Sequence, residues 1–475
     1  MQINKNLLYF FIFHLVIWSI IPIMMRPNLP MDSAEALIWG MIGEFGTNKH
    51  PPLSGYLANW MWLVCGKNPA SLYVLSQILV IGGLYYIYKL ARCFFSQNKS
   101  LIITMLCEGI VYYNYTTTEY NCNIVALLLW PACAYYFYQS VKTNSLVDWT
   151  LFGFFAGLNI INKYVSAILL LCLGLYVLCS SQARIRLKSY KIYYSAILAF
   201  AIITPHFLWA YNHDFFMIDY FIGRSTTSAF KYGLGHIVYP LKFIFAQILA
   251  ALPALIVLFV CYKKSNKIKS TISSDDKKFI FFAGILPLLI MTTIPLITGM
   301  KLKSMWGSPC LYALTIIWFV WFNFDETKYF AKIKQISYYL MSLFALVFFI
   351  QTLLTLSPKY NLDAQKLVRE LNGNNIDYVG GNIWLASIIG SYSNSNPQVM
   401  FDMSAKTNPW IDIDDIKQKG ALVVEESLAA YENHKEEFTN LEPAKEYIIT
   451  SSNILGKTKK HTIYYGNLKG ENNER

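Results

Sequence analysis

Two short stretches near the amino terminus carry side chains that could do chemistry. In MDSAEALIWG (31–40), Asp32 and Glu35 stand three residues apart, so a helix would place both carboxylates on one face. A carboxylate beside a partly desolvated cavity can accept a proton from an attacking hydroxyl or orient it. The same spacing also fits a helix start, with Asp32 as N-cap and Glu35 completing a capping box. Spacing alone leaves both interpretations open.

The second stretch, KHPPL (49–53), follows shortly after the first. Its two prolines fix the backbone and end the preceding helix, so Lys49 and His50 are held rigidly where the next segment begins. A lysine and a histidine beside carboxylates could form a phosphate clamp. A Pro-Pro pair is also common in ordinary loops and identifies no chemistry by itself.

Cations and aromatic residues occur together again further along the chain. Arg and Lys bind phosphate, whereas Trp and Tyr line sugar or prenyl-chain surfaces at a membrane interface. The combination predicts an anion site beside an apolar groove. The candidates are Lys163 and Tyr164 in GLNIINKY, Trp209 and His213 in PHFLWAYNH, Arg224, and Lys301, Lys303 and Trp306 in KLKSMW.

A membrane protein must position these residues. Of 475 residues, 55% are hydrophobic and only 14% are charged, which is too little polar surface to cover a soluble globule. The net charge of +12 comes from small clusters between apolar runs, so we expect no nucleic-acid partner. About eleven apolar runs approach the length of a spanning helix. They are 7–25, 70–93, 100–116, 121–140, 149–163, 165–181, 191–210, 236–262, 279–299, 307–324 and 334–356.

Basic clusters on alternate connections predict the orientation. Lys5 and the segments 89–99, 184–191, 262–278 and 325–334 fall on one side, which we assign to the cytoplasm. The remaining loops then face outward. Cations close to apolar segments are costly on that side unless an anion pairs with them, although any one of them could be an interfacial lysine reaching toward headgroups. Five residues break the positive-inside rule in this way: Lys49, Lys163, Arg224, Lys301 and Lys303.

The chain divides into two parts by composition. Residues 1–357 are expected to form a transmembrane domain with an uncleaved first helix and a first outer loop at 26–69. In that loop we expect an interfacial helix whose apolar face, with Ile38 and Trp39, lies on the bilayer. Residues 358–475 are polar with short alternating apolar pieces, which predicts a small α/β domain on the outer face.

Neither a cofactor nor a dedicated metal site is expected. The nine cysteines lack metal-ligand spacing, and the sequence shows no cluster of ligands. A divalent cation stays open as an alternative. The carboxyl-terminal part shows no nucleophile elbow, phosphate-binding loop or paired-carboxylate motif, so the candidate chemistry lies in the outer loops of the first part.

Six motifs follow one another in a fixed order within residues 5–325. They are D-x-x-E-x-x-x-W-G, K-H-P-P-L, G-L-x-x-x-x-K-Y, P-x-x-x-W-x-x-x-H, the Gln-bearing FIFAQILAALP, and K-x-x-x-x-W-x-x-P. In this order and topology they resemble the dolichyl-phosphate-mannose-protein mannosyltransferase-like family of bacteria. This group of C-type membrane glycosyltransferases includes the lipid A aminoarabinose transferase and the lipopolysaccharide galacturonosyl and galactosamine transferases.

The resemblance implies an activity and a place for it. A sugar would move with inversion from a polyprenyl-phosphate (undecaprenyl-phosphate) donor to an acceptor on the periplasmic side of the bacterial inner membrane. Lipid A or the lipopolysaccharide core is the preferred acceptor, with a protein or another envelope glycan as alternatives. Asp32 stands where the family has its catalytic Asp. Many members have Glu directly after it, whereas this chain has Ser33, so Glu35 is the nearest second acid.

The implied mechanism assigns roles to the outward cations. The leaving phosphate needs no protonation if cations receive its charge, and the candidate receivers are Lys163, Arg224, Lys301 and Lys303. Asp32 would act as base toward a hydroxyl acceptor, and would orient an acceptor phosphate that is already ionised.

Two other classes of protein compete with the enzyme. A lipid-linked sugar transporter or flippase would be expected to show paired repeats and helices broken at the membrane midplane. A non-catalytic assembly protein would use the outer domain to bind a partner. Polar residues crowd at the outer helix ends here, which favours chemistry at the membrane surface.

Overall fold

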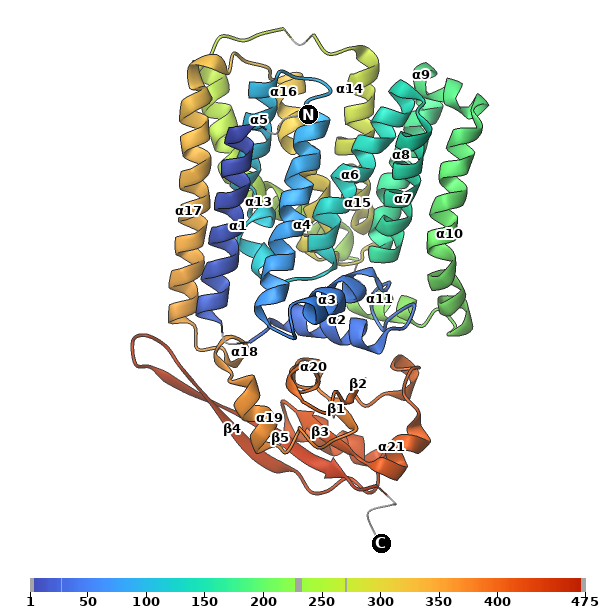
Figure 1. Ribbon diagram of the computed structural model, residues 1–475, viewed down its shortest axis with the longest axis vertical. Helices are drawn as coiled ribbons and strands as arrows, with labels where there is room; N and C mark the ends of the chain where they lie inside the picture. Colours follow the sequence, from blue (N-terminus) through green and yellow to red (C-terminus); the bar gives the residue numbers. More distant parts are fainter. Residues whose placement is uncertain (1–3, 27, 227–232, 270, 471–475) are drawn as a thin grey trace.

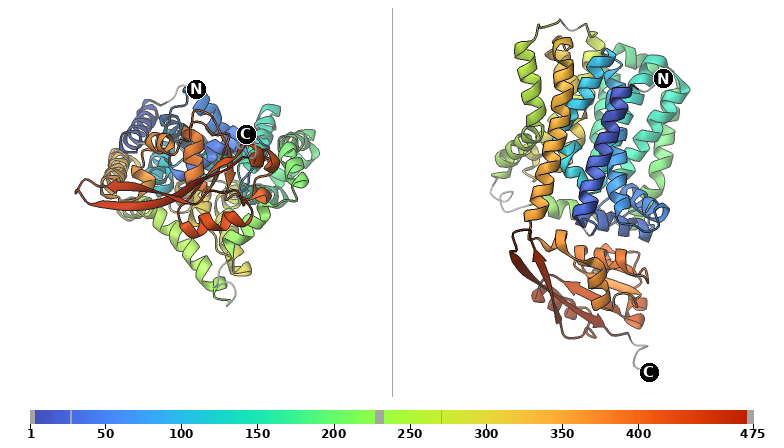
Figure 2. Two further views of the ribbon diagram at one scale, coloured as in Figure 1. Left: turned by 90° about the horizontal axis from the view of Figure 1, so that it is seen from below. Right: turned by 60° about the vertical axis from the view of Figure 1, so that its left-hand side comes forward.

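The chain forms a bundle of long helices with a smaller α/β unit packed against one end (Figure 1). The computed structural model describes residues 4–26, 28–226, 233–269 and 271–470. The amino terminus lies at the end of the bundle that is remote from the α/β unit (Figures 1 and 2). Three short helices lie at the other end, between the bundle and the α/β unit: α2 (Met31–Ile42), α3 (Leu53–Val64) and α11 (Met217–Ser225).

Long apolar helices make this a multi-pass membrane protein. Within the described ranges, seven helices are long and apolar enough to cross a membrane. The segments Tyr164–Cys179 and Ser181–Lys188, which meet at 95°, add an eighth span if they are counted as one. The seven are α1 (Lys5–Met25), α4 (Ala70–Ala91), α6 (Cys122–Thr143), α10 (Tyr190–Asn212), α13 (Gly235–Lys264), Ser274–Thr298, and Thr327–Leu354, which contains α17 (Phe330–Leu354).

Shorter helices occupy the other apolar runs. Because they fall below the length of a full span, the count of about eleven spans stays a prediction. They are α5 (Gln97–Met105), α7 (Leu146–Asn162) and α16 (Leu314–Trp321), with a 3-10 stretch at Ser304–Ala313 before α16. The bent pair contains α8 (Ala167–Cys179) and α9 (Ser181–Arg184), and the span Ser274–Thr298 consists of α14 (Ser274–Ile280), a π-helical turn and α15 (Leu286–Thr298).

The apolar run at 100–116 is not one helix. After α5 the chain continues as short 3-10 turns, and the Asn114 side chain donates to the backbone oxygen of Glu108 (2.7 Å). A side-chain amide that bonds to the backbone in this way replaces a helical backbone bond and favours a turn. The segment therefore turns back at the outer side and brings Glu119 and Asn121 toward α2. Its 3-10 turns are Leu106–Gly109, Val111–Tyr113 and Tyr115–Thr118.

The first outer loop is a pair of crossed helices, α2 and α3. They approach so closely at Gly40 that a Cβ there would lie 2.0 Å from the carbonyl oxygen of Gly55. On its other side, α2 packs against α20 (Ile383–Tyr392) of the α/β unit. Ile38 and Trp39 are buried. The expectation that this face lies on the bilayer was wrong, because the α/β unit covers it.

The carboxyl-terminal part contains a five-stranded mixed sheet in the order β2-β1-β3-β5-β4. β1 pairs in parallel with β2 and β3, whereas β5 pairs antiparallel with β3 and β4. The strands are β1 (Tyr378–Gly381), β2 (Gln398–Phe401), β3 (Ala421–Glu425), β4 (Lys445–Ser452) and β5 (Thr458–Leu468). The other helices of this unit are α18 (Pro358–Asn361), α19 (Ala364–Glu370), α21 (Ile413–Lys419) and α22 (Leu428–Asn433).

Hydrogen bonds tie the α/β unit to the first outer loop. The Asn28 amide donates to the backbone oxygen of Leu362 and accepts from the backbone N–H of Ala364 at 3.0 Å. The Tyr392 hydroxyl accepts from the backbone N–H of Leu29 at 3.0 Å. The loop is therefore held between two layers, the helical bundle and the α/β unit.

Candidate active site

Helix α2 begins one residue before Asp32. Its N-cap is Pro30, which has no side chain that can cap, and Asp32 lies within the first turn. The alternative interpretation of Asp32 as an N-cap was therefore wrong, because the proline sets the start of the helix. The Asp32 carboxylate instead accepts from the side-chain amide of Asn121 (3.4 Å). Next to it, the Ser33 hydroxyl donates to the backbone oxygen of Tyr120 (3.2 Å).

A second carboxylate, Glu119, lies beside Asp32. Its Oε1 accepts the backbone N–H of Asp32 at 3.0 Å. Burial raises the pKa of Glu119 to about 7, with a further contribution from the Asp32 charge. Burial also raises the pKa of Asp32, although Lys49, Arg224 and Lys163 oppose the rise. A carboxyl whose pKa lies near neutrality, as that of Glu119 does, can take up and release a proton near neutral pH.

Two asparagines connect this carboxylate pair to Lys163. The buried ammonium of Lys163 donates to Oδ1 of Asn123. Because an ammonium can only donate, the Asn123 oxygen must face Lys163, and its amide nitrogen donates to Oδ1 of Asn121 at 2.9 Å. Asn121 in turn presents its own amide nitrogen to Asp32. We call Asn121 and Asn123 the amide relay.

Lys163 also contacts the aromatic part of the site. Its Nζ lies 5.4 Å from the ring centroid of Trp306, and Trp306 stacks on Phe221 of α11 at 5.6 Å. A buried cation over an aromatic face is stabilised by the ring electrons. The structure thus brings together Asp32, Lys163 and Trp306, which the sequence placed in three separate motifs.

Glu35 and Lys49 form an ion pair. The Lys49 ammonium donates to Oε1 of Glu35, with side-chain exposures of 10% and 5% for Lys49 and Glu35. Burial alone would lower the pKa of Lys49, but the Glu35 carboxylate and the Tyr220 hydroxyl more than offset it, so the pKa is raised. Lys49 lies 5.5 Å from the ring centroid of Tyr220 in α11.

His50 is held without charge. Burial, together with the nearby cations Lys163 and Lys49, lowers the pKa of His50 to about 3. Its ring stands edge-on to Trp39 at 5.7 Å. Lys49 is engaged by Glu35 and His50 is neutral, and phosphate binding by these two residues stays a prediction. Both residues lie in a rigid turn in which Thr47 Oγ1 accepts from their backbone N–H groups (3.1 and 2.9 Å).

Three cations gather at the more exposed side of the site. Arg224 lies in the last turn of α11, which ends at Ser225. The backbone N–H of Lys301 donates to the carbonyl of Ser225 (2.9 Å), which joins α11 to the loop before Trp306. Partial burial, together with the charges of Arg224 and Lys301, lowers the pKa of Lys303. Three neighbouring cations with an accessible side form a site suited to an anion.

Trp209 contacts the first outer loop directly, and Tyr164 and His213 support that contact through His206 and Trp209. Tyr164 and the backbone oxygen of Phe45 both bond to the ring of His206, at 2.8 and 2.6 Å. The Trp209 indole donates to Glu44 (2.9 Å), and its ring fills the space where a Cβ of Gly46 would lie. His213 donates to the backbone oxygen of Trp209 (2.7 Å). These contacts clamp residues 43–46, and direct substrate binding by the three residues stays a prediction.

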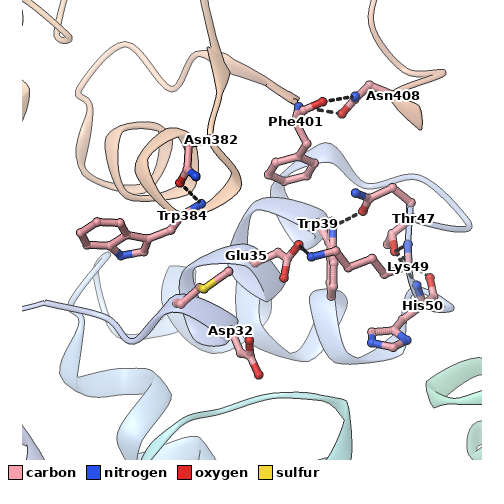
Figure 3. A network of polar contacts seen from close by, with 12 residues as sticks. Asp32, Glu35, Trp39, Thr47, Lys49, His50, Asn382, Trp384, Phe401 and Asn408 are labelled. Atoms are coloured by element: carbon pink, nitrogen blue, oxygen red, sulfur yellow. Dashed lines mark hydrogen bonds and ion pairs between the residues drawn. The ribbon is translucent and has the colours of Figure 1, made fainter. Parts of the chain in front are cut away.

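The α/β unit forms the roof of the site. Figure 3 shows the Glu35–Lys49 pair facing the segment with Asn382 and Trp384 and the strand end with Phe401. Lys359 lies over the Trp384 ring at 5.4 Å and is close enough to lower the pKa values of Asp32 and Glu119. Among the residues that the structure describes, no group of three or more His, Cys, Asp or Glu side chains is arranged to hold a metal ion.

Sequence reasoning missed Glu119, Asn121, Asn123 and Lys359. Glu119 was detectable in principle as an acid in the second outer loop, on the same side as Asp32. The asparagines of TTTEYNCN carried no signal, because their function depends on neighbours that are 40 or more residues away. Lys359 lies at the start of the α/β unit, whose position over α2 was not predicted.

Comparison with known proteins identifies relatives over most of the chain. The family model described as dolichyl-phosphate-mannose-protein mannosyltransferase matches residues 49–209. The lipopolysaccharide core galacturonosyltransferase RgtB of Rhizobium johnstonii is 21% identical over 299 residues, which cover 61% of this chain and 59% of that protein. The chain thus spans less than two thirds of the length of this curated relative.

Two crystal structures of ArnT from Cupriavidus metallidurans resemble the whole chain. The structure bound to undecaprenyl phosphate gives a TM-score of 0.54 at 13% identity and covers 98% of both chains. The apo structure gives a TM-score of 0.50 and covers 96% of this chain and 97% of ArnT. The expected fold class, a polytopic helical membrane protein, is thereby confirmed.

Proposed function

We propose that this chain, which belongs to the dolichyl-phosphate-mannose-protein mannosyltransferase family of C-type membrane glycosyltransferases, transfers a sugar from a polyprenyl-phosphate donor to an envelope acceptor. The observation that carries the proposal is the Asp32–Glu119 carboxylate pair, linked by the amide relay to Lys163 and flanked by Arg224. Acids for proton transfer and cations for a phosphate leaving group are thus combined at one site.

The donor phosphate fits the cationic side of the site. Arg224, Lys301 and Lys303 would bind it, with Lys163 beneath them. Trp306 and Phe221 offer a stacked aromatic surface for the sugar or the first prenyl units. Solved ArnT with bound undecaprenyl phosphate supports a donor of this chemical class.

Transfer then requires one displacement at the anomeric carbon. The acceptor oxygen attacks from the face opposite the phosphate, the bond from the anomeric carbon to the phosphate oxygen breaks, and its electron pair leaves on the phosphate. The cations receive that charge without protonating it. If the acceptor is a hydroxyl, its proton passes to the Asp32 carboxylate, and the neighbouring Glu119 carboxyl, whose pKa is raised, is a second group that can take it up.

Lipid A or the lipopolysaccharide core is the acceptor that we favour, at the periplasmic face of the bacterial inner membrane. The relationship to the galacturonosyltransferase RgtB supports this choice. A lipid acceptor also suits a site at the outer ends of the helices, because the lipid could reach it along the membrane surface.

The Asp32→Asn variant tests the proposal. We expect normal amounts of protein in the membrane and loss of the modified acceptor in mass spectra of lipid A and core from expressing cells, because the amide cannot accept the proton. Asp414→Asn, on the exposed helix α21, is the matched control and should behave like the parent. Modification at the parental rate by the Asp32→Asn protein would exclude the proposed role and would favour a transporter or an assembly protein.

A further inference from the structure

The long hairpin of the α/β unit ends in an unusual tip. We define the hairpin tip as residues 453–457, between β4 and β5. Viewed from the α/β side, the hairpin extends past the outline of the helices (Figure 2, left). In Figure 1 the tip lies level with the lower end of α17, where that spanning helix leaves the bundle. The tip is therefore next to the place where the membrane surface must lie.

Hydrogen bonds fix the tip to the end of α17. The backbone N–H of Ile454 donates to the carbonyl of Leu353 (3.1 Å), and the Asn453 amide donates to the carbonyl of Leu354 (3.2 Å). The last carbonyls of a helix have no partner within the helix, so these two donors satisfy groups that would otherwise need water. The height of the tip is thus set by the outer end of a spanning helix.

The tip is also rigid within itself. Asn453 Oδ1 accepts from the backbone N–H groups of Leu455 and Lys457, both at 3.1 Å. Gly456 has a φ of 72°, which is the left-handed conformation that glycine adopts at no steric cost. A tip built in this way holds its side chains in fixed directions.

Its two large apolar side chains remain exposed. Ile454 is 64% exposed and Leu455 is 66% exposed. On α17, the outer residues Ile350 and Leu354 are each 46% exposed and form part of the helix surface available to lipid. The tip therefore continues the lipid-facing apolar surface of α17. Three exposed lysines follow the apolar pair: Lys457, Lys459 and Lys460.

We propose that the hairpin tip inserts Ile454 and Leu455 into the interfacial layer of the outer leaflet, with Lys457, Lys459 and Lys460 at the phosphates of anionic headgroups. Apolar side chains flanked by lysines are the composition of segments that lie in a membrane interface. The lipid surface is favoured over a protein partner because a spanning helix fixes the depth of the tip. The tip would anchor the α/β unit at the membrane, on the side remote from α21.

Photo-crosslinking in the full-length protein tests the insertion. The photoreactive amino acid p-benzoylphenylalanine replaces Leu455, and the protein is irradiated in vesicles of phosphatidylethanolamine and phosphatidylglycerol. We expect a phospholipid adduct, detected by mass spectrometry, at position 455. The matched control places the same amino acid at Gln418, an exposed residue of α21, which lies on the far side of the α/β unit, and should give none. No lipid adduct at 455, or an adduct to protein instead, overturns the proposal.

The lysines are tested separately. The Lys457→Glu, Lys459→Glu and Lys460→Glu changes are combined with the photoreactive residue at 455. We expect a lower adduct yield in vesicles that contain phosphatidylglycerol and the parental yield in vesicles of phosphatidylcholine alone, because only the first carry anionic headgroups. Equal yields for parent and variant in the anionic vesicles would overturn the headgroup contact. Neither experiment depends on sugar transfer, so the proposed function can fail without affecting the result.

Discussion

At the scale of single residues, the raised pKa of Glu119 beside Asp32 links the chemistry of the site to the stability of the fold. Burial raises that pKa from 4.5 to about 7. Between these values the folded protein binds a proton that the unfolded chain does not, so stability falls as the pH rises through this window. Above pH 7 Glu119 is ionised in the folded protein as well, and the full free-energy cost of burying its charge lowers the stability.

We therefore expect Glu119→Gln to stabilise the protein at pH 8 by up to about 3 kcal/mol, because 2.5 pKa units at about 1.4 kcal/mol each are removed. The glutamine oxygen can still accept the backbone N–H of Asp32. Below about pH 4.5 parent and variant should unfold alike, which thermal unfolding of the solubilised protein across this pH range would show. A parent whose stability rises between pH 5 and 7 would contradict the assignment.

The amide relay is expected to orient Asp32 for catalysis. Asn123→Leu removes the two relay hydrogen bonds made by the Asn123 side chain, to Lys163 and to Asn121. We expect kcat to fall by roughly 10- to 100-fold with little change in KM, because Asp32 loses its orientation. Asn123→Asp is the matched variant, since it keeps the contact with Lys163 but cannot donate to Asn121. Both should lose activity in a transfer assay. An active Asn123→Asp enzyme would show that the link from Asn123 to Asn121 is not needed.

Residue chemistry was only partly predictable from sequence. Asp32 became a candidate through its spacing from Glu35 and through the family resemblance. The cations became candidates because isolated positive charges beside apolar segments in outer loops are costly unless an anion pairs with them. The ion pair between Glu35 and Lys49 was not predicted, although both residues were candidates. A sequence does not show the distance between a helix and the turn that follows it. The role of Asn121 and Asn123 could be recognised only in the folded structure, because Lys163 lies 40 residues beyond Asn123 in the sequence.

At the scale of elements, the position of Glu119 depends on the break after α5. The sequence predicted a helix over 100–116 from its apolar composition. A buried cluster replaces it: His14 bonds to Glu108 at 2.6 Å and to Gln77 at 3.1 Å, and Gln77 donates to the backbone of Thr117 (3.2 Å). Three separate elements supply this cluster, so local composition could not reveal it. The 3-10 turns end in the residue before Glu119.

The loop between α2 and α3 depends on the Glu35–Lys49 pair. Removing one partner leaves a buried charge, so Glu35→Gln or Lys49→Met alone should each cost about 3 kcal/mol in unfolding free energy. The double variant should recover much of the loss, because neither charge remains. Chemical unfolding of the four proteins gives the comparison. If the double variant lost the sum of the two single effects, the residues would not act as a pair.

At the scale of the whole molecule, the α/β unit turns an open loop into an enclosed site. Composition indicated a polar unit after residue 357 but not where it packs, because the apolar face of α2 is equally suited to lipid or protein. Asn28 makes the junction, through bonds to the Leu362 carbonyl and the Ala364 N–H. These bonds are buried, so losing them leaves backbone groups without partners.

Asn28→Leu should therefore loosen the α/β unit from the bundle, at a cost of about 1–3 kcal/mol for each unsatisfied buried group. We expect faster proteolytic cleavage in the connection at 355–362 and reduced transfer, because the roof over Glu35 and Lys49 is displaced. Asn382→Leu is the matched control: it removes the cap of α20 within the unit and leaves Asn28 in place. The Asn382→Leu change should lower the stability of the α/β unit but should not speed proteolytic cleavage in the connection at 355–362. Cleavage of the Asn28→Leu protein at the parental rate would mean that the packing of α2 against α20 holds the two layers together without the Asn28 bonds.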